Sequence, residues 1–320
     1  MRLRYRALVW AMQRHRARLN FLCIVFLLPI SAHAQSTGTG DLPAPSTKTR
    51  NRPLLLRAAR QLPSDLEVGG EISGIHGGAT RYFTRADLLT LPQVSFLVNG
   101  DTNFNGPTRI SGVRLEDLAK RIASAPDSDM AVAICDDQYR ANYPRDYMAS
   151  HHPVLVLNVN GKPPAGWPKD SVEHKYDMGP YMISHSKFIP SFKILAHSDE
   201  PQIPWGVVRI EFRNENTVFG SIAPRGPRAA DAAVQAGYRI AKQNCFRCHS
   251  SGSEGGTKSG ITWRSLADQA SAAPEDFSSY IFKPVSKNAS AQMPDNPPYD
   301  KATLAAITAY FQTFHGEAKP

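Results

Sequence analysis

The chain has 320 residues, of which 42% are hydrophobic, and it carries 25 prolines, four cysteines and a formal net charge of +9. The apolar fraction excludes a collagenous or fully disordered chain, and four cysteines are too few for a small disulfide-framed scaffold. The excess of basic residues would suit a nucleic-acid or membrane partner. Whether it supports such a partner depends on where along the chain these residues lie.

The basic residues concentrate at the N-terminus. Residues 1–34 hold six of the 37 basic residues and none of the 28 acidic ones, so 31 basic and 28 acidic residues, a formal charge of +3, remain. The apolar run Leu19–Ile30 and the small residues up to Ala34 follow, in the order typical of a secretory signal peptide. No two arginines are adjacent there, which favours Sec-type export over the twin-arginine route.

This pattern predicts a periplasmic protein with a signal peptide over 1–34. The alternative is an uncleaved segment that anchors the chain in the membrane, facing the periplasm, and membrane contact is expected only in that case. The near-neutral remainder gives no support to a nucleic-acid partner.

The rest of the sequence divides into four parts by composition. They are a flexible linker over 35–63, a mixed region over 64–222, a Pro- and Gly-rich linker over 223–228 and a helical region over 229–318. Short β-branched and aromatic runs in the mixed region predict strands at Val94–Val98, Ala131–Cys135, Val154–Val159 and Val207–Phe212.

Two helices are expected between these strands. Thr84 can cap a helix over Arg85–Leu91, with Asp87 completing the capping box, and apolar spacing predicts a second helix over Arg114–Ala123. The expected fold class is therefore multidomain, an α+β domain followed by an all-α domain.

The strongest chemical signal begins at Cys245. Cys245 and Cys248, followed by His249, form the pentapeptide C-x-x-C-H, the attachment motif of c-type haem. Two thiols about one helical turn apart can bond the two vinyl groups of one haem, and the adjoining imidazole can bind the iron. Met293 follows in a polar loop, and its soft thioether is suited to the sixth iron position of an electron-transfer haem.

These features resemble class I cytochrome c domains over residues 229–317. Ala236–Tyr238 is similar to the contact of the family's first helix, Leu304–Phe311 to its last helix, and Gln292–Tyr299 to its methionine loop. The resemblance implies one covalent haem c, with Cys245 and Cys248 as thioether ligands and His249 and Met293 as axial ligands.

One departure concerns the axial histidine. The family usually carries Gly-Pro after the pentapeptide, and the proline carbonyl orients the histidine. Gly260–Trp263 stands there instead, so another backbone carbonyl, not identifiable from the sequence, would have to orient His249.

The same residues allow other interpretations. Cys245 and Cys248 could bind zinc or act as a redox pair, but zinc needs two further ligands and redox pairs lie at βα junctions. Met293 could be a packing residue, with His315 as ligand or the sixth position open; an open position or a readily displaced ligand would suit a ligand-sensing haem.

The mixed region has a second resemblance over residues 80–215. Its pieces occur in the order seen in the molybdopterin-binding domain of the sulfite oxidase family, at Gly112–Leu118, Val132–Tyr139, Pro153–Leu157 and Trp205–Phe212. The cysteine that binds molybdenum in that family would fall in Phe96–Asn105, which has none.

Cys135 is the remaining candidate for a metal-binding thiol. Its place in an apolar run favours a small buried hydrophobe instead, and Sec-type export disfavours a cofactor loaded in the cytoplasm. Molybdopterin is therefore not expected.

Further polar clusters have no recognisable metal spacing. The imidazoles are those of His151, His152, His174, His185 and His197. Tyr139, Arg140, Tyr143, Arg145 and Tyr147 could line a polar cleft or an anion site, but a structural role is favoured.

The sequence predicts a monohaem electron-transfer protein with an unidentified redox partner protein and no catalytic residues of its own. The alternative is an enzyme, a molybdopterin-dependent oxidoreductase with a fused cytochrome c domain as electron acceptor.

Overall fold

The computed structural model describes residues 54–76, 78–122, 124–169, 177–186, 202–296 and 299–315. All of them belong to one compact unit, residues 46–320. The expected signal peptide over 1–34 and most of the linker expected over 35–63 lie outside the described residues. Within the described part, no helix has the length and hydropathy needed to cross a membrane.

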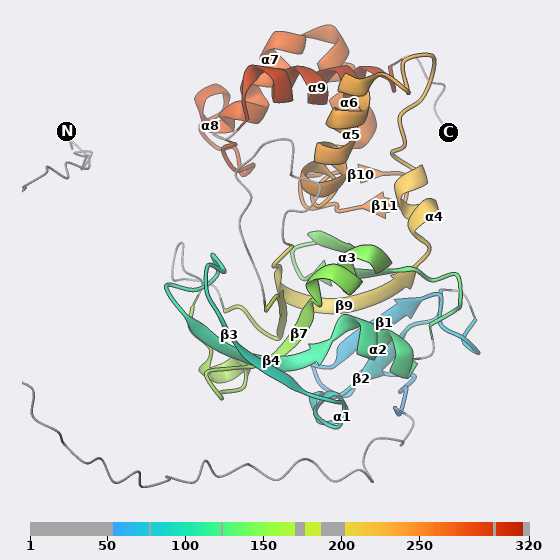
Figure 1. The fold of residues 1–320 in the computed structure, drawn as a ribbon, viewed down its shortest axis with the longest axis vertical. Coiled ribbons are helices and arrows are strands. Elements are labelled where there is room, and N and C mark those ends of the chain that lie inside the picture. Colours follow the sequence, from blue (N-terminus) through green and yellow to red (C-terminus); the bar gives the residue numbers. More distant parts are fainter. Residues whose placement is uncertain are drawn as a thin grey trace, which may run out of the picture. The chain divides into compact units, whose positions relative to one another are not determined.

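The first part of the described chain forms a nine-stranded sheet with four short α-helices and the 3-10 helix η2 (Pro164–Gly166), called here the sheet region (residues 64–222) (Figure 1). The strands are β1 (Leu66–Gly70), β2 (Arg81–Phe83), β3 (Val94–Val98), β4 (Thr108–Arg114), β5 (Met130–Cys135), β6 (Arg140–Pro144), β7 (Val154–Val159), β8 (Tyr181–Ser184) and β9 (Trp205–Arg213). The helices are α1 (Arg85–Leu89), α2 (Leu115–Ile122), α3 (Arg145–His151) and α4 (Glu215–Gly220).

The strand order is β2-β1-β9-β8-β7-β4-β3, and β5 pairs with both β6 and β9. Strand β9 thus pairs with three strands: parallel with β1 and antiparallel with β5 and β8. Most residues of β5 and β7 are buried, as expected of strands covered on both faces.

The four predicted strands are present as β3, β5, β7 and β9, with ends shifted by at most two residues. The two predicted helices are α1 and α2, and Thr84 and Asp87 form the expected capping box. The helix expected from Arg114 begins at Leu115 because Arg114 still belongs to β4, and Ala123 lies outside the described residues.

The second part, called here the helical region (residues 229–315), contains α5 (Ala232–Ile240), the π-helical turn η4 (Ala241–Cys245), α6 (Trp263–Ala272), α7 (Pro274–Phe282), α8 (Pro284–Lys287) and α9 (Lys301–Gln312). A short hairpin of β10 (Ser250–Ser251) and β11 (Glu254–Gly255) interrupts it. Helices α5, α6 and α7 gather around α9 (Figure 1).

The helical region is built on an aromatic core. Trp263 donates a hydrogen bond from Nε1 to the Tyr310 hydroxyl at 3.1 Å, and that hydroxyl donates to the carbonyl of Ile222 at 2.6 Å. The rings of Trp263 and Phe311 lie 4.9 Å apart. The same core cluster includes Met130 and Val132 of β5, so the two regions pack against each other through apolar contacts.

Gly237 sets how closely α5 and α9 approach. A Cβ atom at this position would lie 2.1 Å from the carbonyl oxygen of Ala306, closer than atoms can approach. The expected contact between the small-residue segment Ala236–Tyr238 and the last helix is therefore present, and glycine is required there.

We expect Gly237→Ala to lower the free energy of unfolding by about 1–3 kcal/mol, because α5 must move away from α9. Gly220→Ala is the matched control, since a Cβ atom there would meet nothing within 4 Å. Denaturant titration followed by tryptophan fluorescence measures both, and equal stability of the two variants would contradict the close crossing.

Candidate functional site

The pentapeptide begins at Cys245, the last residue of η4, which continues α5. The backbone amides of Cys248 and His249 donate to the carbonyl of Cys245 at 3.1 and 3.0 Å, so the motif is wound into one turn. Cys245 and Cys248 are free thiols and both are partly exposed. The turn therefore presents two thiols and an imidazole in the compact arrangement that attachment of one haem c requires.

His249 is held by its Nδ1 atom. That atom lies 2.8 Å from the carbonyl oxygen of Ile261 and 2.9 Å from the Ser259 hydroxyl. A carbonyl can only accept, so Nδ1 carries the proton and Nε2 has its lone pair available for a metal. The carbonyl that the sequence could not identify is thus that of Ile261, in the segment where the resembled family has proline.

Burial lowers the pKa of His249, and the hydrogen bond to Ile261 offsets this only in part. The imidazole is therefore neutral at pH 7, which is the state that binds a metal. Its fixed tautomer and neutral charge suit an axial ligand.

Met293 lies in the loop between α8 and α9 and packs, half-buried, against the same core cluster as Cys245. Asn296 fixes this loop, since its side-chain amide donates to the carbonyls of Ile281 at 2.9 Å and Pro294 at 3.1 Å. The methionine loop is also joined to η4, directly before the pentapeptide, because Asn244 donates to the hydroxyl of Tyr299 at 2.8 Å.

The surroundings of the two motif cysteines give little support to zinc binding in the described part of the chain. Burial raises the pKa of Cys245 to about 12 and also raises that of Cys248. Zinc sites use thiolates, and no group of three His, Cys, Asp or Glu side chains in the described part of the chain could hold a metal ion. The described residues therefore give no support to a zinc site.

Cys135 ends β5 and is 2% exposed, in the core of the sheet region. Burial raises the pKa of its thiol well above the usual value. A protonated buried thiol agrees with the prediction of a small hydrophobe. It lines a cavity of about 230 Å³ whose other walls include Tyr139, Trp205, Arg247 and Lys258.

The predicted polar clusters take part in packing. His185 is buried, its Nε2 lies 3.0 Å from the Tyr147 hydroxyl, and Tyr143 donates to the carbonyl of Gln202 at 2.7 Å. His152 pairs with Glu116 at 2.6 Å. His174 and His197 lie outside the described residues.

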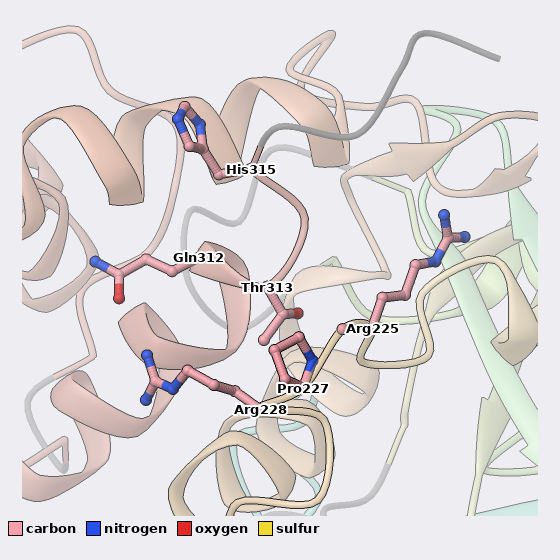
Figure 2. A pocket seen from close by; sticks show the side chains of 7 residues that line it. Arg225, Pro227, Arg228, Gln312, Thr313 and His315 are labelled. Carbon is pink, nitrogen blue, oxygen red and sulfur yellow. The ribbon is translucent and has the colours of Figure 1, made fainter.

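His315, the alternative axial ligand, lies just after α9. It lines a cavity of about 340 Å³ together with Arg225, Pro227 and Arg228 of the interdomain linker (Figure 2). Its Nδ1 atom lies 3.7 Å from the carboxylate of Asp268 on α6. His315 therefore lies beside α6 and a cavity shared with the linker, whereas Met293 lies on the loop that is joined to the pentapeptide.

Comparisons with known proteins bear on the helical region as a whole. Residues 232–311 match the family model described as cytochrome C oxidase, cbb3-type, subunit III, which confirms the expected cytochrome c domain. A search of curated proteins found no match.

One similar solved structure is the crystal structure of the sulfane dehydrogenase SoxCD from Paracoccus pantotrophus. The match covers 54% of this chain and 45% of that one, at 13% identity and a TM-score of 0.32. The chain thus spans less than half of that protein's length, and a likeness of this size carries no argument about activity. The expected fold class is borne out by the strands and helices themselves, an α+β region followed by a helical one.

His185, buried in the sheet region, makes the stability of the fold depend on pH. Burial lowers its pKa from 6.5 to about 3, so below pH 6.5 the unfolded chain takes up a proton that the folded chain does not. The free energy of unfolding should therefore fall as the pH is lowered from about 6.5 to about 3. This residue contributes up to about 1.4 kcal/mol per pH unit to that fall.

We expect His185→Gln to flatten this part of the pH profile. Denaturant titrations at pH 7, 6 and 5 measure it, with the exposed His76→Gln as control. A slope equal to that of the unsubstituted chain would contradict the neutral buried state.

Proposed function

We propose that this chain is a periplasmic monohaem c-type cytochrome that transfers single electrons between partner proteins. The observation that carries the proposal is the one-turn pentapeptide whose His249 is fixed through Nδ1 by the carbonyl of Ile261. The match of residues 232–311 to a cytochrome family model supports it. The expected signal peptide supports the periplasmic location.

The residues that would hold haem c are Cys245, Cys248, His249 and Met293. Haem c bound in this way supplies a one-electron couple whose potential is raised by a thioether ligand. Ile261 and Ser259 keep the imidazole in one orientation and one tautomer. The buried rings of Phe246, Trp263 and Tyr310 exclude water from the interior behind the motif.

We propose that the sheet region docks a redox partner protein or holds the helical region in place. Its residues fit the molybdopterin alternative poorly. The segment Phe96–Asn105 has no cysteine, and Cys135 is a buried thiol with a raised pKa.

Replacing Met293 by leucine should remove the sulfur ligand while keeping the apolar volume. We expect the weak far-red absorption of ferric thioether-ligated haem to disappear and the midpoint potential to fall, because a thioether favours reduced iron. Met178→Leu, in the buried core of the sheet region, is the control. An unchanged far-red band in Met293→Leu would point to another sixth ligand.

Metal content separates the electron-transfer protein from the enzyme. We expect about one iron and no molybdenum per purified chain, and loss of covalent haem in Cys245→Ala and Cys248→Ala. Elemental analysis and the spectrum of the denatured chain in pyridine measure this. Molybdenum that is present and is lost in Cys135→Ser would establish the enzyme instead.

A further inference from the structure

Arg140 lies at the start of β6 and is buried, with 7% of its surface exposed. Its guanidinium reaches out of the sheet region into the β10–β11 hairpin of the helical region. Nη1 donates to the carbonyls of Gly255 at 3.2 Å and Ser253 at 3.3 Å, and Nη2 donates to Glu254 at 3.3 Å. One side chain therefore bonds three successive residues of that hairpin.

The backbone around Arg140 also contacts the pentapeptide. Its amide donates to the carbonyl of Arg247, between the two motif cysteines, at 2.9 Å. The carbonyl of Gln138 accepts from the amide of Thr257 at 3.3 Å. The β5–β6 turn is thus hydrogen-bonded to the chain on both sides of His249.

The hairpin that Arg140 holds lies directly on the motif. A Cβ atom at Gly255 would be 2.5 Å from the carbonyl oxygen of His249, and one at Gly256 would be 1.8 Å from that of Arg247. The hairpin backbone thus packs directly on the backbone of the motif, and the ring of Phe246 packs against Gly255 as well. A displacement of the hairpin must therefore move the segment that carries His249.

The contact is charged as well as close. Glu254 is buried, with 6% of its surface exposed, and it pairs with Arg140 and Arg213. Glu211 lies 3.7 Å from Arg140 and 3.0 Å from Arg213. Removing Arg140 would leave buried carboxylates less compensated beside the motif, a change that costs stability and favours an oxidised, more positive iron.

We propose that Arg140, although it belongs to the sheet region, is a positioning residue of the haem site: through the β10–β11 hairpin it holds the loop over 245–258 in place. The inference rests on the proposed function, since it concerns the residue's effect on the bound haem. In this proposal the sheet region helps to position the haem-binding motif, in addition to any docking role.

The test uses the full chain with haem attached, in three variants. Arg140→Met removes the charge and the hydrogen bonds but keeps an apolar side chain of similar length. Arg140→Lys keeps the charge but not the planar fork that reaches two carbonyls. Arg109→Met is the matched control, because Arg109 is an exposed arginine of β4.

Two readouts are required together. In Arg140→Met we expect amide hydrogen exchange in peptides over 245–258 to rise at least several-fold and the midpoint potential to shift downward. Arg140→Lys should show both effects with smaller size, and Arg109→Met neither. If Arg140→Met fails to acquire haem, Arg140→Lys carries the test alone.

Unchanged exchange over 245–258 in both Arg140 variants would overturn the positioning role, whatever the potential does. Raised exchange with an unchanged potential would also overturn it, because the residue would then be structural only. Absence of haem from the unsubstituted chain would instead refute the proposed function.

Discussion

The close crossing of α5 and α9 at Gly237 is the constraint on which the site depends. Helix α5 runs through η4 into the pentapeptide, and α9 follows the methionine loop. The rings of Tyr238 and Tyr310 lie 5.6 Å apart beside the crossing. Both ends of the proposed iron site are therefore attached to one helix pair, and the distance between these helices limits where His249 and Met293 can lie.

Interactions close in sequence could be predicted well. The capping box of Thr84 and Asp87 spans one turn, and the four strong apolar runs each contain enough β-branched residues to specify a strand. Strands β1, β2, β4, β6 and β8 were not predicted. Strand β6, for example, is a polar segment over Arg140–Pro144 that pairs with β5 and is buried through contacts with residues distant in sequence, such as Gln202 and Glu254.

For the site as well, features set by neighbouring residues could be predicted, whereas contacts between distant residues could not. Cys245, Cys248 and His249 could be identified because haem attachment requires them within one turn, and Met293 because it precedes the final helix. The carbonyl of Ile261 could not be chosen from the sequence, since any residue has a carbonyl and only the loop's path selects one. Arg140 is 107 residues before the carbonyl of Arg247 that its own amide bonds, so only the tertiary fold brings them together.

Because the connection over 223–228 is short, the sheet region and the helical region can stay together through weaker contacts than two separate chains would need. A turn at Gly226, whose carbonyl accepts from Ala229 at 3.1 Å, keeps this connection compact. A tether of this length gives the joined surfaces an effective concentration on the order of millimolar. Ion pairs and hydrogen bonds too weak to hold two separate chains together can therefore persist here, and the haem-bearing part needs no large apolar interface to stay with the sheet.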